Sequence, residues 1–321
     1  MTLAEKLGEL VLSSSGSYEN VNSGVARVCV PSLTLQDGPV GLAFGDTGVT
    51  QLPAPPGIAA TFDTALARRY GQVEGSEARG QGIDVVQGPN LNIDRVPESG
   101  RAFEGYGEDP FLVSTMGVAD IEGIQSQGVL ADAKHLVAYS QETNRAALDA
   151  RVSSPALNEI YLAPFKAAVV QAHVASIMCA YPELKGTFQC EDPALAQILK
   201  QWGFSGFVRS DLGAVHDPAA LSAGTDPLKP ASVADLSAGV THGLVPVSTV
   251  DADVDVDVER MLTRMFDFGL VGRTSTGAPG TPVDTPAHAA FALSAAERSA
   301  VLTQNRSNLL PMTQPTSGRW R

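Results

Sequence analysis

Along this chain, short strand-like runs of apolar residues alternate with longer stretches whose apolar residues recur with helical spacing. The helical stretches are residues 63–81, 110–127, 154–172 and 192–202. The runs that follow them read IDVVQ, VLADAKH, VASIMCAY and GFVRSD, and an earlier run, VCVPSLTLQ, leads to Asp37. Such alternation is typical of parallel strands joined by crossover connections. The pattern therefore predicts an α/β protein, built as an open doubly wound sheet or as a closed barrel.

Polar residues at the ends of these runs favour the barrel. They are Asp37, Arg95, Lys134, His135, Tyr181 and Asp211. In a (β/α)8 barrel the carboxyl ends of all strands converge on one face, which holds the active site. An open sheet gathers its ligand groups mainly at one switch point. Because the candidates are spread over most of the chain, we expect residues 1–273 to form a TIM-like (β/α)8 barrel.

The composition changes at residue 274. Residues 274–286, TSTGAPGTPVDTP, are rich in Gly, Pro, Ser and Thr and read as a linker. A helical pattern, AHAAFALSAAERSAVLTQN, follows, and SNLLPM begins another apolar run. We therefore expect residues 274–321 to be a linker and the beginning of a second α/β domain, whose remainder is missing from this sequence.

Charge and composition narrow the kind of partner. Hydrophobic residues make up 44% of the chain, and 22 basic against 35 acidic residues give a net charge of −13. Such a surface repels the phosphates of nucleic acid and anionic membranes, but a neutral sugar is unaffected. No apolar stretch is long enough to cross a bilayer. The N-terminus, MTLAEKLGELVL, reads as an amphipathic helix rather than a signal peptide, so a cytoplasmic location is expected.

Three cysteines are few and odd in number. Cys179 and Cys190 flank a candidate hairpin, so a local disulfide is one interpretation, and three reduced thiols is the more common one. No CxxC or Cys/His cluster indicates a metal site, and nothing in the sequence calls for a cofactor.

Asp211 is the candidate with the most direct chemistry. A carboxylate after an apolar strand, with Gly213 close behind, would stand at a barrel mouth with room for a ligand. Glycoside cleavage with retention needs such a carboxylate to attack the anomeric carbon and form a covalent ester. The alternative is that Ser210 or Asp211 simply caps the next helix.

The other candidates also have two interpretations. Lys134 and His135 could donate hydrogen bonds to sugar hydroxyls, or they could form a salt bridge at a helix start. Asp37 could point into a pocket or belong to an ordinary Asp-Gly turn. Arg95 and Arg101 lie in one loop, and either could bind a hydroxyl or pair with an acidic neighbour.

Taken together, the motifs are more specific than their members. LQDGPVG, NLNIDRVPESGRAFEGYGEDP, AKHLVAYSQETNR, MCAYPELKGTFQCEDP, GFVRSDLGAVH and AGTDP follow one another in one order. The chain thereby resembles glycoside hydrolase family 3, of the β-glucosidase type, over nearly its whole length. The resemblance implies that Asp211, in the SDW-type motif, is the nucleophile. It also implies that the sugar is bound by Asp37, Arg95, the Lys134–His135 pair and Tyr181.

The sequence departs from this pattern at several points. Leu212 replaces the usual Trp after the nucleophile, Ala180 and Pro182 flank Tyr181, and Glu98 replaces a common arginine. The substrate is expected to be a β-glucoside or other small glycoside, with its sugar less certain than its reaction. Retention also needs an acid/base carboxyl, which the resemblance places outside this sequence, in a completing domain or a partner chain. Glu142, in QETNR, is expected to be structural.

Two other functions remain open at this stage. The chain could be an inactive sugar-binding remnant that lacks its acid/base domain. It could also be an aldolase-like barrel in which Lys134 forms a Schiff base.

Overall fold

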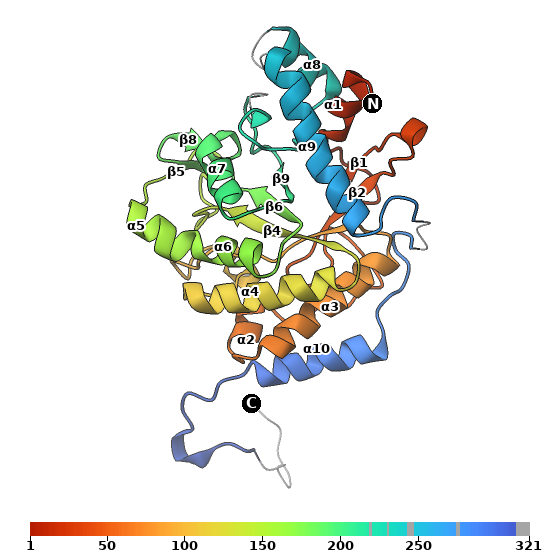
Figure 1. The fold of residues 1–321 in the computed structure, drawn as a ribbon. Helices are drawn as coiled ribbons and strands as arrows, with labels where there is room; N and C mark the ends of the chain where they lie inside the picture. Colours follow the sequence, from red (N-terminus) through yellow and green to blue (C-terminus); the bar gives the residue numbers. More distant parts are fainter. Residues whose placement is uncertain (218–219, 230, 243–246, 274–276, 313–321) are drawn as a thin grey trace.

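The computed structural model describes residues 1–217, 220–229, 231–242, 247–273 and 277–312. Its centre is a curled six-stranded sheet with the order β1-β2-β3-β4-β6-β9 (Figure 1). The strands are β1 (Asn20–Asn22), β2 (Leu33–Asp37), β3 (Val85–Gln87), β4 (Leu130–Leu136), β6 (Ser176–Cys179) and β9 (Phe207–Ser210). In this sheet β2, β3, β4, β6 and β9 run parallel to one another, whereas β1 pairs with β2 antiparallel.

Two short extended segments connect the edges of this sheet. The segment 226–229 runs beside β9, where the Asp226 amide donates to the Val208 carbonyl at 2.7 Å. It also runs parallel to residues 10–12, with the Leu12 amide donating to the Leu228 carbonyl at 3.1 Å. Ser13 then pairs antiparallel with Val21 of β1. The TIM-barrel-like α/β fold is thus confirmed, but eight regular parallel strands are not. Among the described residues this sheet has five parallel strands and the reversed β1, and the two short segments connect its edges.

Helices cover the outside of the sheet (Figure 1). They are α1 (Leu3–Glu9), α2 (Pro55–Ala59), α3 (Thr64–Gly80), α4 (Pro110–Gln125), α5 (Ser154–Ala156), α6 (Ala163–Val170), α7 (Pro193–Gln201), α8 (Val233–Thr241), α9 (Val247–Asp267) and α10 (Pro286–Arg298). The helices predicted at 63–81, 110–127 and 192–202 agree closely, whereas the stretch 154–172 is broken by a π-helical turn at Leu157–Tyr161. The helical pattern predicted over residues 287–305 is helical only as far as Arg298. Capping side chains explain where two of these helices begin. Asp63 accepts hydrogen bonds from backbone amides in the first turn of α3, and Asp109, which precedes Pro110, accepts one from the first turn of α4.

Glycines let α3 and α4 approach closely. A Cβ on Gly71 would lie 2.2 Å from the Asp120 carbonyl oxygen, and one on Gly123 would lie 2.2 Å from that of Arg68. Any larger residue at these positions would push the helices apart, so both glycines are needed for this packing.

A second, small sheet lies beside the barrel. It has the order β5-β7-β8, with β5 (Asp149–Ala150) parallel to β7 (Glu183–Leu184) and β7 antiparallel to β8 (Thr187–Phe188). The β7–β8 pair is the hairpin predicted between Cys179 and Cys190, whereas β5 was not predicted.

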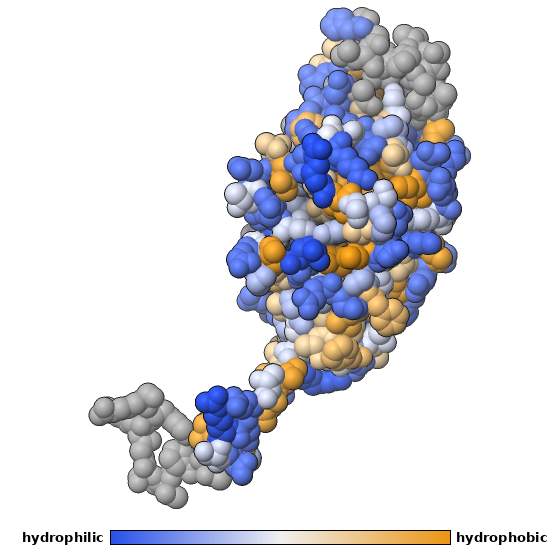
Figure 2. Space-filling model, turned by 90° about the vertical axis from the view of Figure 1, so that its left-hand side faces the viewer, coloured by the Kyte–Doolittle hydropathy of each residue, from blue (hydrophilic) through white to orange (hydrophobic). Residues whose placement is uncertain are grey.

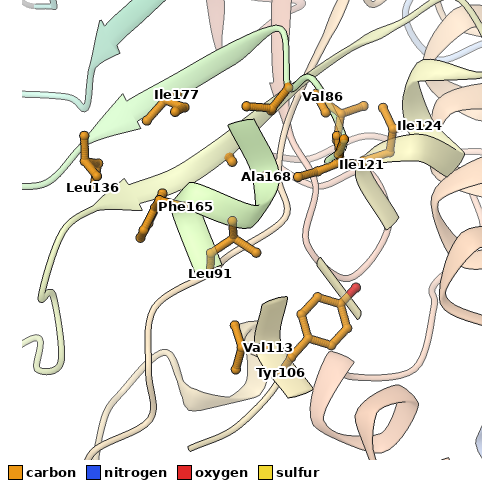
Figure 3. Packing of buried hydrophobic residues seen from close by; sticks show 14 of the residues in the cluster. Val86, Leu91, Tyr106, Val113, Ile121, Ile124, Leu136, Phe165, Ala168 and Ile177 are labelled. Atoms are coloured by element: carbon orange, nitrogen blue, oxygen red, sulfur yellow. The ribbon is translucent and has the colours of Figure 1, made fainter. Parts of the chain in front are cut away.

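Apolar side chains fill both sides of the sheet. On one side, Leu136 of β4 and Ile177 of β6 lie near Phe165 and Ala168 of α6 (Figure 3). A second cluster lies towards α1, α8 and α9 and includes Leu7, Leu33, Phe207, Met261 and Met265. Every residue of β3, β4, β6 and β9 is buried, which is the pattern that continuous apolar runs predict for parallel strands. No helix in the described ranges is long and apolar enough to span a membrane.

The expected linker is held against the barrel over residues 277–285. Gln81 donates to the Thr281 carbonyl at 3.0 Å, and the Val283 amide donates to Gly48 at 2.7 Å. Helix α10 is held in turn by His288, whose Nδ1 lies 2.7 Å from Glu77 Oε1. The apolar run SNLLPM forms no strand within residues 307–312: Arg306–Asn308 form a 3-10 turn, and the segment leads away from the body (Figure 2). The second domain expected from residue 274 stays a prediction.

Candidate active site

Five of the six predicted site residues converge on one pocket, of about 70 Å³, at the carboxyl ends of the parallel strands. Asp37 ends β2, Lys134 and His135 lie in β4, and Tyr181 and Asp211 follow β6 and β9. The lining residues are Glu19, Asp37, Gln87, Arg101, Lys134, His135, Met178, Tyr181 and Asp211. Larger hollows lie elsewhere in the described part of the chain, such as one of about 570 Å³ beside α7 and α9, which none of the predicted site residues lines.

Asp211 stands at the mouth of this pocket. One carboxylate oxygen accepts a hydrogen bond from the Leu212 amide at 2.6 Å, and the other lies 3.5 Å from His135 Nε2. Burial, the Asp211 charge and a hydrogen bond to Asp211 raise the pKa of Tyr181, so its hydroxyl stays protonated and available to that carboxylate. Residues 212–217 form turns rather than a helix, which removes the helix-cap interpretation of Asp211.

His135 is held as a neutral ring. Burial first, and then the nearby cations of Arg101 and Lys134, lower its pKa well below the ordinary value. Its Nδ1 lies 3.0 Å from Asn92 Oδ1, an acceptor, so Nδ1 carries the hydrogen and Nε2 is left as an acceptor. The contact between His135 and Asp211 is therefore not an ion pair, and Nε2 can accept a hydrogen bond from a sugar hydroxyl. Sequence reasoning missed Asn92, whose place in an irregular loop gave no signal.

Lys134, which is buried, forms an ion pair with the partly exposed Asp37. Burial works to raise the pKa of Asp37, but the charges of Lys134 and Arg101 outweigh it and hold that pKa below its usual value. This pair supplies both a charged donor and a charged acceptor to hydroxyl groups in the pocket. A Schiff-base role for Lys134 needs a free amine, which this pairing opposes.

Of the two candidate arginines, Arg101 faces the pocket and Arg95 does not. Arg101 lines the pocket, donates to Glu104 at 2.9 Å and lies 5.8 Å from the centre of the Tyr139 ring. Arg95 is exposed. Both follow β3 in one irregular loop, and no periodicity there indicates which side chain turns inward.

A wall of aromatic and charged residues borders Tyr181. The Arg145 guanidinium lies 4.3 Å from the centre of the Tyr181 ring, and Tyr139 meets Tyr181 edge-on at 5.8 Å. Glu142 accepts hydrogen bonds from Tyr139 and, at 2.8 Å, from Arg145. These contacts give Glu142 the structural role expected for it.

The remaining lining residues were also missed. Glu19, which precedes β1, accepts a hydrogen bond from Gln87, and its carbonyl accepts one from Lys229 at 3.3 Å. The positions of Glu19 and Gln87 depend on the pairing of β1 with β2 and of β2 with β3, which local sequence does not reveal. Among the described residues, no group of three or more His, Cys, Asp or Glu side chains could hold a metal ion.

Cys179 and Cys190 are joined by a disulfide, and Cys29 is free and exposed. The expectation of three reduced thiols is therefore wrong for this pair. Disulfides are uncommon in the reducing cytosol, so the cross-link does not support the cytoplasmic location expected from the sequence, which stays a prediction.

Comparison with known proteins assigns the chain to a family. The family described as "Glycosyl hydrolase family 3 N terminal domain" matches residues 11–262. "Probable beta-glucosidase L" of Aspergillus terreus is 34% identical over an alignment of 345 residues, gaps included. The alignment covers 99% of this chain and 46% of that protein. The "Exo-alpha-(1->6)-L-arabinopyranosidase" of Bifidobacterium longum is 33% identical over 97% of this chain and 42% of its own length.

A solved structure shows the same likeness. The structure of DesR, a beta-glucosidase from Streptomyces venezuelae in complex with D-glucose, matches with a TM-score of 0.89 at 35% identity, over 98% of this chain and 42% of that one. The chain thus spans less than half the length of these proteins. On the family match, the sequence identity and the shared fold, this chain belongs to glycosyl hydrolase family 3 through its N-terminal domain.

Proposed function

We propose that this chain is the nucleophile-bearing domain of a retaining, exo-acting glycosidase that releases terminal β-D-glucosyl or related residues. The observation that carries the proposal is the position of Asp211, in one small pocket with Tyr181, His135 and the Asp37–Lys134 pair. The name of one relative, an exo-acting arabinopyranosidase, supports exo action.

In the proposed reaction, an Asp211 oxygen attacks the anomeric carbon while the bond to the leaving oxygen breaks and that oxygen takes a proton. The product of this step is a glycosyl ester on Asp211. Water then attacks the same carbon, the ester bond breaks, and the sugar leaves with its original configuration while the Asp211 carboxylate is regenerated. A neutral His135 leaves the charge on Asp211 available for attack.

The acid that protonates the leaving oxygen has to be a second carboxyl group about 5–5.5 Å from the nucleophile. Asp37 is bound to Lys134 and Glu142 to Arg145, so neither suits this role. We place the acid/base in a completing domain or partner chain, in keeping with the share of its relatives' length that this chain covers. Glu19 is the one pocket carboxylate that these pairings leave unassigned, so Glu19→Gln belongs in the test.

The names of the relatives support a glucoside as the first substrate to test. Two of those compared are called beta-glucosidases, one with D-glucose bound, and one is called an arabinopyranosidase. The sugar at the non-reducing end is therefore proposed to be glucose or a related pyranose.

The test is covalent labelling with 2,4-dinitrophenyl 2-deoxy-2-fluoro-β-D-glucoside, whose good leaving group needs little help from an acid. We expect a single adduct of one fluoroglucosyl unit in the intact mass, mapped by peptide sequencing to Asp211. Asp211→Asn should give none, and Glu19→Gln should label at the wild-type rate. Binding of glucose without an adduct would instead indicate an inactive sugar-binding remnant, and neither binding nor labelling would refute both functions.

A further inference from the structure

A short turn behind the pocket contacts three of the segments that carry the proposed site residues. It is the 3-10 turn η4 (Gln189–Glu191), referred to as the 189–191 turn. Gln189 and Cys190 are buried, with 3% and 0% of their surface exposed. The turn precedes α7 and follows the β7–β8 hairpin, so it belongs to none of the parallel strands.

Each residue of the turn holds a different segment. Gln189 Oε1 accepts the Val137 amide at 2.6 Å, just after His135. Cys190 is bonded through its sulfur to Cys179, the last residue of β6 and two residues before Tyr181. Glu191 Oε1 accepts the amides of His216 at 2.6 Å and Asp217 at 2.9 Å, in the segment that follows Asp211.

Further contacts extend the same connection. The Cys190 carbonyl accepts the Thr225 hydroxyl at 2.7 Å, just before the segment that pairs with β9. Phe188 stacks on the His216 ring, with centroids 3.7 Å apart and planes at 24°. Gln189 Nε2 is buried without a hydrogen-bond partner among the described residues. A buried unpaired donor is unfavourable for stability, so this amide is not explained by stability alone.

The segments held in this way have little regular structure of their own. Residues 137–148 and 211–217 are turns and bends, whereas β4, β6 and β9 are fixed by their ladders only as far as their last paired residues. Beyond those ends, the spacing of Tyr181 and Asp211 depends on contacts between loops. His135 lies inside β4, but at the point where the register between β4 and β6 shifts, between Ala133 and Leu136. A misplacement of about 1 Å between reacting groups can cost on the order of a hundredfold in rate.

We propose that the 189–191 turn is a positioning device, which fixes the ends of β4, β6 and β9 relative to one another so that His135, Tyr181 and Asp211 meet in one pocket. Gln189, Cys190 and Glu191 are positioning residues: they touch no reacting atom and act through the segments they hold. This inference rests on the proposed glycosidase function for its kinetic consequence, but not for its structural one.

The experiment compares variants of the turn with matched controls. Glu191→Ala removes the acceptor for the two amides, and Glu191→Gln restores an acceptor oxygen. Cys179→Ala/Cys190→Ala removes the cross-link, and Cys29→Ala removes the exposed free thiol, which touches neither the turn nor the pocket. Labelling by the fluoroglucoside is followed against its concentration, which separates the limiting rate constant from the apparent affinity. Hydrogen exchange of peptides 135–139 and 212–217 is compared with that of α3 and α4.

We expect E191A and the double cysteine variant to lower the limiting labelling rate by about tenfold or more. E191Q should recover most of the rate, and C29A should match the wild type. Exchange should rise in 135–139 and 212–217 while α3 and α4 stay protected.

Wild-type labelling and exchange in E191A and the double variant would overturn the proposal. An equal rise in exchange over α3 and α4 would do so too, because it would show general destabilisation. If the wild type itself is not labelled, the proposed function fails, and the exchange comparison still decides whether the turn orders the pocket.

Discussion

His135 Nε2 lies 3.5 Å from Asp211 Oδ2, although the two side chains come from β4 and from the loop after β9, strands separated by β6 in the sheet. The imidazole is kept neutral by burial and by neighbouring cations, and its other nitrogen is bound to Asn92. No ion pair to His135 therefore opposes nucleophilic attack by the Asp211 carboxylate. This relationship suits a nucleophile better than an ion-paired structural aspartate would, and it leads to the first two predictions.

Asp211→Gly should remove nearly all turnover of dinitrophenyl β-glucoside, with a loss in kcat of about 10⁴-fold or more, because the attacking atom is gone. Azide should restore part of the activity by attacking from the vacated side, and the product should be the α-glucosyl azide. Product configuration is read by NMR. A β-configured azide, or activity of the variant equal to that of the wild type, would exclude Asp211 as the nucleophile.

Asn92→Asp should place a negative charge beside His135 Nδ1 and raise the depressed pKa of that ring. Below the new pKa the imidazolium would pair with Asp211 and weaken its attack. We expect labelling by the fluoroglucoside to fall as the pH is lowered through roughly 6 to 7, near the ordinary histidine pKa. Asn92→Gln provides the neutral comparison, and a profile shared by all three proteins would refute this account of His135.

Arg101→Met should weaken binding of the fluoroglucoside about tenfold or more, since a hydrogen bond to a charged group is worth about 1.5–3 kcal/mol. Arg95→Met should change it less than twofold, because Arg95 is exposed and outside the pocket. Apparent affinities come from the concentration dependence of labelling, with folding checked by circular dichroism. The reverse ranking would restore the role that the resemblance gave to Arg95.

Leu212→Trp should strengthen binding of aryl glucosides. Leu212 follows the proposed nucleophile and is 52% exposed, so a larger ring has room to contact an aryl group. Aromatic stacking worth about 0.5–1.5 kcal/mol corresponds to a fall in KM of roughly two- to tenfold. Leu212→Ala is the control, and methyl glucoside, which has no aryl group to stack on the new ring, should show no gain. Equal effects on both substrates would mean that the change acts elsewhere.

Asp120→Asn should flatten the dependence of stability on pH. Asp120 is buried beside Glu74 and accepts a hydrogen bond from Tyr106 at 2.7 Å. Burial raises its pKa from 3.8 to about 7, although the Tyr106 bond opposes this. The folded state therefore binds more protons than the unfolded state, and stability from this group is full below about pH 4 and is lost as the pH rises to about 7.

The loss amounts to about 4 kcal/mol at most, from about 1.4 kcal/mol for each pKa unit. Urea unfolding gives the free energy of unfolding of the wild type and of D120N at pH 4 and at pH 7. The change in the difference between the two proteins from pH 4 to pH 7 measures this loss. Parallel curves for the two proteins would show that Asp120 titrates normally in the folded state.

Much of this arrangement could be read from the sequence because it is local. Asp63 and Asp109 cap the starts of α3 and α4, the helices that the periodicity predicted at residues 63–81 and 110–127. Asp37, Lys134 and Asp211 lie at or near the carboxyl ends of strands. Because these ends share one face of a barrel, the sequence alone predicts that the three side chains lie close together.

The alternation of strands and helices, the barrel class and the candidate residues at strand ends can therefore be read from the amino-acid sequence, since each depends on neighbours along the chain. Only the tertiary structure decided that β1 runs backwards, that Arg101 rather than Arg95 faces the pocket, and that Cys190 bonds to Cys179. The tertiary structure also brought Asn92 against the His135 ring and Glu191 against the amides of His216 and Asp217. These choices depend on contacts between irregular loops far apart in sequence, whose backbone directions no local periodicity encodes.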